Sequence, residues 1–170
     1  MIEVGIFRNL VSSEINHMGL IERIAALFKS KNIDMAGTWR GEYSYSAQYP
    51  EAVKDKSVQF IAEIQTGENG YFNGIIKESE EGVPEVSTIK GEIKGNRLSF
   101  VKTYQNRYQM IETSEIIITS QTPQYITYTG VFLSSEKIFV GQWKISSSYI
   151  SANGQKVNHV SLGNWKMMKC

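Results

Sequence analysis

Hydrophobic and polar residues alternate along most of the chain, and the period of this alternation changes near residue 36. Before that point, apolar residues recur at steps of three and four between Ile15 and Phe28, which predicts an amphipathic helix of about four turns. From Gly37 onward the period is two, which is typical of strands with one buried face. The pattern therefore predicts an N-terminal helical segment over residues 1–36 and a β domain over residues 37–170.

The period-two region divides into nine runs, separated by turn residues such as Asn69-Gly70 and Asn153-Gly154. No helical period lies between them, which disfavours a parallel sheet with crossover helices. Closing an up-and-down antiparallel barrel requires an even number of strands, so either residues 2–7 form a tenth strand or one run is broken. We expect about eight main strands, with a two-sheet sandwich as the alternative. The runs are 37–46, 57–66, 70–78, 86–93, 96–104, 112–120, 125–132, 137–149 and 155–168.

The alternation also assigns each side chain to a face. Trp39, Tyr43 and Tyr45 share the apolar face of the first strand, and Lys102 and Tyr104 share the apolar face of the fifth. The opposite faces are polar, whereas a membrane barrel places its apolar residues outside. The sequence therefore predicts a mainly β fold, an antiparallel barrel curled around its own core.

Loop lengths differ between the two ends of the predicted barrel. If the first strand runs upward, the loops at 47–56, 79–85, 105–111 and 133–136 lie at the upper end, and three of these four are long. The turns at 67–69, 94–95, 121–124 and 150–154 then lie at the lower end. An open mouth above a tightly connected base suits a ligand-binding cup. This polarity places Trp39 and Trp143 toward the base as core residues.

Lys102 is the residue that departs from the apolar pattern of its face. A buried, unpaired ammonium is prohibitively costly, so Lys102 must pair with an internal carboxylate, extend to the mouth or meet an anionic ligand. Other residues are expected at the same level, and with Lys102 they form the candidate ligand site: Tyr43, Tyr45, Tyr104, Arg107 and Trp165. Aromatic walls with a cation suit an amphipathic or anionic small molecule.

Composition and motifs exclude several classes of function. The 18 Lys and Arg balance 17 Asp and Glu, which argues against a partner such as duplex nucleic acid. No apolar stretch approaches the ~20 residues of a membrane span. No sequence motif implies a cofactor. His17 and His159 have no metal-ligand or catalytic partners nearby in sequence, so we assign neither metal nor catalytic residues. The acidic run Glu78, Glu80 and Glu81 is expected to be a solvated loop.

Cysteine usage and the N-terminus bear on location. The single cysteine, Cys170, allows no intramolecular disulfide, and residues 1–14 lack the pattern of a secretory signal. The expectation is a cytoplasmic protein.

The first strand opens with Gly37-Thr38-Trp39 directly after the predicted helix. This resembles the calycin group of lipocalins and avidin-like proteins, and Gly-x-Trp recurs at 141–143 and 163–165. The resemblance implies a calycin-like barrel that binds a small ligand in its mouth. Lipocalins place a late arginine against the first tryptophan, whereas here only Lys166 or Lys169 is available. The polar set with which avidins hold biotin is absent. A looser likeness is to the cyclic-dinucleotide-sensing barrels of bacterial antiphage effectors.

Three functions follow as expectations. The leading one is a non-enzymatic barrel that binds a small amphipathic or anionic molecule at an aromatic mouth. The alternatives are a cyclic-nucleotide sensor and a protein-interaction module that uses residues 15–28 to contact a second copy or another protein. Catalysis by tyrosine, lysine or glutamate is a less favoured possibility, because no paired positions support it.

Overall fold

A computed structural model describes residues 33–46, 49, 54, 56–110, 115–151 and 153–170. The helix predicted between Ile15 and Phe28 and the alternative strand at 2–7 lie outside these residues. Residues from Ile33 to Cys170 form one compact unit. Met35, ahead of the first strand, is completely buried in its core.

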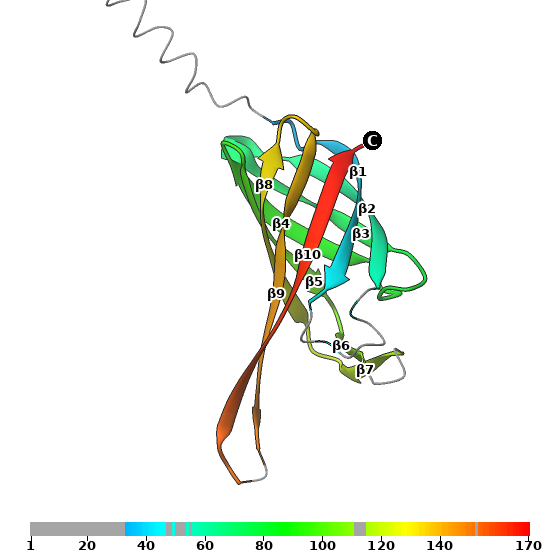
Figure 1. The fold of residues 1–170 in the computed structure, drawn as a ribbon, viewed down its shortest axis with the longest axis vertical. Helices are drawn as coiled ribbons and strands as arrows, with labels where there is room; N and C mark the ends of the chain where they lie inside the picture. The colour runs from blue at the N-terminus through cyan, green and yellow to red at the C-terminus, as the bar shows by residue number, and fades with distance from the viewer. Residues whose placement is uncertain (1–32, 47–48, 50–53, 55, 111–114, 152) are drawn as a thin grey trace, which may run out of the picture. The chain divides into compact units, whose positions relative to one another are not determined.

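The strands are β1 (Gly37–Tyr45), β2 (Ser57–Thr66), β3 (Tyr71–Glu78), β4 (Ser87–Lys94), β5 (Arg97–Tyr104), β6 (Arg107–Met110), β7 (Ile116–Ser120), β8 (Gln124–Leu133), β9 (Ile138–Ile150) and β10 (Lys156–Lys169), with a short 3-10 turn η1 (Glu68–Gly70). Eight of them close an antiparallel barrel in the order β1-β10-β9-β8-β5-β4-β3-β2 (Figure 1). The predicted mainly β, antiparallel barrel of eight strands is confirmed.

The sixth of the nine runs, 112–120, does not enter the barrel. Residues 116–120 form β7, which pairs with β6 in a separate two-stranded sheet between β5 and β8. The expected loop at 105–111 therefore contains a strand, and β5 pairs directly with β8. This hairpin insertion explains why nine runs give eight barrel strands.

The insertion also changes which connections lie at each end of the barrel, compared with the prediction. Because β6 and β7 leave the barrel order, every strand after them runs opposite to the predicted direction. The predicted base positions of 121–124 and 150–154 are wrong, as is the upper position of 133–136. We call the end where β1 finishes the mouth; it carries the connections after β1, β3, β5 and β9.

Strand alternation produces the core as expected. In β2 every second residue from Val58 to Ile64 is buried, and the residues between them are exposed. Trp39 lies at the base, where its indole donates to the Met35 carbonyl at 2.8 Å and its ring lies 5.6 Å from that of Phe139. The Lys169 ammonium stands 6.0 Å from the Trp39 ring centroid.

Trp143 is not at the base, contrary to the prediction. Its ring lies 5.8 Å from the Tyr45 ring and 6.3 Å from the Tyr43 ring, near the mouth. The reversed direction of β9 is the cause, because this reversal carries Trp143 to the other end of the barrel.

Gly141 is a position at which the barrel tolerates no side chain. A Cβ there would overlap the carbonyl oxygen of Thr129 on the neighbouring strand and the backbone of Gly130. These are backbone atoms of two paired strands, so relief would require moving the sheet itself.

We therefore predict that Gly141→Ala lowers the free energy of unfolding by about 1–3 kcal/mol through overpacking, measured by urea denaturation. Gly67→Ala is the matched control, because its Cβ would come no closer than 3.5 Å to another atom. Equal stability of the two variants would contradict this account of Gly141.

Candidate ligand site

The mouth end of the barrel contains a cavity of about 490 Å³, which we call the mouth pocket. Side chains from β1, β5, β8, β9 and β10 and from the β6–β7 hairpin line it. Eight of its described lining residues are tyrosine or tryptophan: Tyr43, Tyr45, Tyr49, Tyr104, Tyr108, Tyr125, Tyr128 and Trp143. Such a wall presents flat apolar faces with a few hydroxyl groups.

Five of the six residues predicted from the sequence line this pocket: Tyr43, Tyr45, Lys102, Tyr104 and Arg107. The sixth, Trp165, is not part of the pocket lining. Its ring packs in the barrel interior, 5.7 Å from Phe100 and 5.8 Å from Tyr128. Its indole N–H points to the carbonyl oxygens of Thr129 and Gln142, so it is a core residue with its donor satisfied.

Lys102, which lines the pocket, forms a buried ion pair with Glu78. Both side chains are essentially inaccessible to solvent, at 1% and 0% exposed. Lys102 Nζ and the Tyr104 hydroxyl both donate to Glu78 Oε1. The Tyr43 hydroxyl and the Val83 N–H donate to Oε2 at 3.0 and 2.7 Å. The predicted solvated loop at Glu78 is therefore wrong, since this residue ends β3 and points inward.

Burial and pairing act in opposite directions on these two groups. Burial alone would raise the pKa of Glu78, but the charge and hydrogen bond of Lys102, with the Tyr104 hydroxyl and the Val83 N–H, hold it below its ordinary value. Burial lowers the pKa of Lys102, and Glu78 only partly offsets this effect. Glu78 thus has four hydrogen-bond donors that stabilise its charge, whereas the charge of Lys102 is stabilised mainly by Glu78.

Three tyrosine rings surround the ammonium of Lys102. Its Nζ lies 5.1 Å from the Tyr43 ring centroid, 4.8 Å from that of Tyr104 and 5.9 Å from that of Tyr128. These distances are within the range of cation–π attraction. Of the three alternatives that the sequence leaves open for Lys102, the structure shows pairing with an internal carboxylate.

The tyrosine hydroxyls around the pocket remain protonated near neutral pH. Burial raises the pKa of Tyr45 to about 12, and burial together with the nearby Glu78 charge raises the pKa of Tyr43 and Tyr104. Protonated hydroxyls can donate hydrogen bonds, and those of Tyr43 and Tyr104 already do so to Glu78. The Tyr45 hydroxyl is hydrogen-bonded to that of Tyr43 and is likewise a neutral polar group of the wall.

Arg107 supplies the positive charge at the rim. Within the described part of the chain, its guanidinium has no ion pair or hydrogen bond, although its backbone oxygen accepts from Thr119 at 3.3 Å. No carboxylate lines the mouth pocket itself. Glu85, nearby, accepts hydrogen bonds from the Tyr108 hydroxyl at 2.8 Å and from the Gln105 and Asn106 backbone. The rim is therefore electropositive at Arg107.

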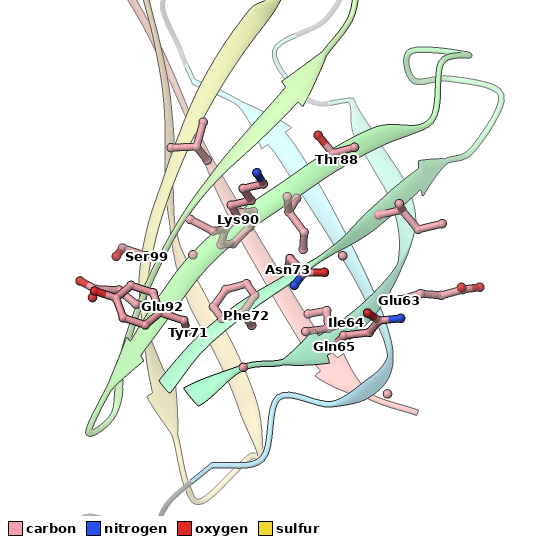
Figure 2. A pocket seen from close by; sticks show the side chains of 18 of the residues that line it. Glu63, Ile64, Gln65, Tyr71, Phe72, Asn73, Thr88, Lys90, Glu92 and Ser99 are labelled. Atoms are coloured by element: carbon pink, nitrogen blue, oxygen red, sulfur yellow. The ribbon is translucent and has the colours of Figure 1, made fainter. Parts of the chain in front are cut away.

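A second, wider hollow of about 1120 Å³ lies on the outside of the barrel across β2 to β5 (Figure 2). Figure 2 shows Glu63, Asn73 and Lys90 on three neighbouring strands of this surface. These three residues face outward and differ in charge, and the hollow is also lined by exposed apolar side chains, those of Tyr71, Ile75 and Val101. This hollow lacks the enclosing aromatic walls of the mouth pocket.

The described ranges contain no cluster of three His, Cys, Asp or Glu side chains arranged to hold a metal. They also contain no helix of the length and apolarity that crossing a membrane requires.

We predict that Lys102→Met lowers the free energy of unfolding at pH 7 by about 3–5 kcal/mol, because it leaves a buried carboxylate without its countercharge. In the wild type the lowered pKa of Glu78 gives stability that is present above its unfolded value of 4.5 and lost as the pH falls. In the variant, burial acts unopposed by Lys102 and raises that pKa, so ionised Glu78 destabilises. The difference in free energy of unfolding between wild type and variant should therefore be smaller at pH 4 than at pH 7, as measured by urea denaturation at both pH values.

The matched control is Glu78→Gln combined with Lys102→Met, which removes both charges and keeps an acceptor for the two tyrosines. It should recover most of the loss at pH 7. A loss that is the same at both pH values, or the same in both variants, would contradict the role of the buried charge.

Comparison with known proteins gives a fold-level likeness. No family model matches the chain, and no curated protein matches it. Among solved structures, it is similar to EF1p2_mFAP2b bound to DFHBI, with a TM-score of 0.50 and 14% sequence identity. The match covers 80% of this chain and 94% of that one. At this identity the likeness concerns the fold alone: the chain shares its closed antiparallel barrel with a protein that binds a small molecule.

Proposed function

We propose that the protein binds a small amphipathic molecule in the mouth pocket and catalyses no reaction on it. The observation that carries this proposal is an aromatic-walled cavity of about 490 Å³ at one end of a barrel whose interior is otherwise packed. Cavities of roughly 300–1,000 Å³ with mostly apolar walls and few polar groups are typical of small-molecule sites.

The polar groups suggest how such a ligand lies. Tyr43, Tyr45 and Tyr104 contact its flat apolar body, and the Arg107 guanidinium meets an anionic group at the rim. Because Glu78 already neutralises Lys102, the charge that selects an anion is that of Arg107. The Tyr45 hydroxyl is already hydrogen-bonded to that of Tyr43, so Tyr45 offers the ligand its ring.

The fold and one contact at the base of the barrel support the hypothesis that the protein resembles the calycin group. The first tryptophan of the Gly-x-Trp motif, Trp39, has the Lys169 ammonium against its ring, where lipocalins place an arginine. The similar solved barrel also binds a small molecule. Membership of the calycin group and a cytoplasmic location stay predictions.

The alternatives receive less support. A cyclic dinucleotide has two phosphates and needs about two cations, and Lys102 is already held by Glu78. Of the two described lysine and arginine residues that line the pocket, Lys102 is paired, and Arg107 alone favours a ligand with a single negative charge. The interaction module through 15–28 depends on residues outside the described ranges and stays a prediction.

The proposal predicts saturable binding of an anionic aromatic probe. In fluorescence titrations, anilinonaphthalene sulfonate should bind the wild type, and Arg107→Gln should weaken it by about tenfold, equivalent to ~1.4 kcal/mol. N-phenylnaphthylamine has the same rings without the sulfonate, so the substitution should leave its affinity unchanged. Arg97→Gln is the matched control, because Arg97 lies at the base end of β5 and lines another hollow.

A blocking variant locates the probe. Ser147 is half-buried and lines the pocket, so Ser147→Trp should abolish binding of both dyes by filling the cavity. Undiminished binding to Ser147→Trp, or equal effects of the two arginine substitutions, would refute the proposed site. Native mass spectrometry of gently purified protein would then identify a retained ligand by its mass.

A further inference from the structure

The last two strands continue beyond the barrel as a two-stranded arm, which we define as residues 145–150 of β9 and 156–161 of β10. The pairing of β9 with β8 ends at Lys144, and the pairing of β10 with β1 ends at Gly163. Beyond these points β9 and β10 pair only with each other within the described sheet. Figure 1 shows them running together well past their neighbouring strands.

The arm lacks both the neighbouring strands that stabilise a sheet and the residues that protect a sheet edge. An isolated two-stranded ribbon is marginally stable in water, and three strands or a packed face are needed for independent stability. At its tip Ile150 is 67% exposed. Residues 145–150 of β9 include no charged residue and no proline, which are the usual means of protecting a strand edge from pairing.

The direction of the backbone groups on the outer edge of β9 follows from two hydrogen bonds. Ser46 N–H donates to Leu162 O at 3.2 Å, so the backbone groups of Leu162 point toward β1 and away from β9. Ser151 N–H donates to Gln155 O at 2.9 Å across the turn, which makes that pair a bonded one. Bonded and non-bonded pairs alternate in antiparallel strands. The backbone groups of Ser146, Ser148 and Ile150 therefore point outward from β9.

We propose that this outer edge of β9 pairs with the same edge of a second copy of the chain, giving an antiparallel dimer. An antiparallel strand is self-complementary about a twofold axis, as an isologous interface requires. With Ser148 opposite the same residue of the second copy, Ser146 lies opposite Ile150 at both ends. All three residues then exchange backbone hydrogen bonds, and no like charges meet.

The dimer bears on the mouth pocket, although the inference does not depend on its ligand. Ile145, Ser146 and Ser147 line that pocket from the base of the arm. A strand of the second copy would extend the sheet beside them, in the position that β8 occupies lower on β9. Self-association would thus extend this wall of the pocket.

The full-length protein tests the proposal in sedimentation velocity runs across a concentration series to about 100 μM. The wild type should reach twice the mass of one chain. Ser148→Lys puts two like charges directly opposite each other and should weaken association at least about tenfold. Ser148→Pro removes an outward N–H without removing a bond between β9 and β10, and should do the same.

The matched control is Asn158→Lys, which adds the same charge to the exposed face of the other arm strand and should leave the dimer intact. Circular dichroism and thermal unfolding establish that each variant is folded. A wild type that stays monomeric at the highest concentration would overturn the proposal. So would a dimer that persists in both Ser148 variants or that is broken only by Asn158→Lys, because association would then use another surface.

Discussion

The carboxylate of Glu78 is enclosed at the mouth end of the barrel, and the surrounding strands are held in place by the donors that it requires. Tyr43 from β1, Lys102 and Tyr104 from β5, and the Val83 N–H from the loop after β3 all converge on its two oxygens. A buried carboxylate without these partners is strongly unfavourable. The register of three strands and one loop is thus coupled to a single charged group. Because the charges of Lys102 and Glu78 cancel, this part of the pocket presents tyrosine rings and no net charge.

Aromatic packing explains why the only room found inside the described barrel is at the mouth. The base is filled by Trp39, Phe132 and Phe139, with ring centroids 4.9–5.6 Å apart along the chain of contacts. The middle is filled by Phe100 and Tyr128, which stack at 4.6 Å, together with Trp165. Close packing at these levels leaves no room for a ligand. Above them the walls diverge into loops and strand extensions, and the mouth pocket lies there.

The same end of the barrel carries the irregular elements of the fold. The β6–β7 hairpin and the β9–β10 arm both leave the barrel at the mouth and both contribute to the pocket wall. The base is closed by short turns, by Met35 and by the Lys169–Trp39 contact. Specific recognition is often placed on such extensions, because the barrel below them is rigid and tolerates variation in its loops.

The sequence by itself determined the eight barrel strands and the face to which their side chains belong. Alternation is a local property, so the inward positions of Trp39, Tyr43 and Lys102 could be predicted without any knowledge of which strands pair. The same signal was present for Glu78, which continues the inward positions of Phe72 and Ile76 in β3, but the neighbouring Glu80 and Glu81 suggested a solvated loop. Lys102 was therefore recognised as unusual while its partner was missed.

Only the tertiary structure decided which elements meet. Whether residues 116–120 belong to the barrel depends on pairing between β5 and β8, which lie about twenty residues apart and leave no periodic signal in the sequence. That one pairing reverses β8, β9 and β10 relative to the expectation, moves Trp143 to the mouth and brings the arm beside the pocket. Trp165 pairs with Tyr43 on the neighbouring strand but packs in the interior and does not line the pocket, because which inward rings contact one another depends on how the closed barrel packs. Local periodicity fixes the direction of a side chain across its strand, whereas its neighbours are fixed by long-range pairing and packing.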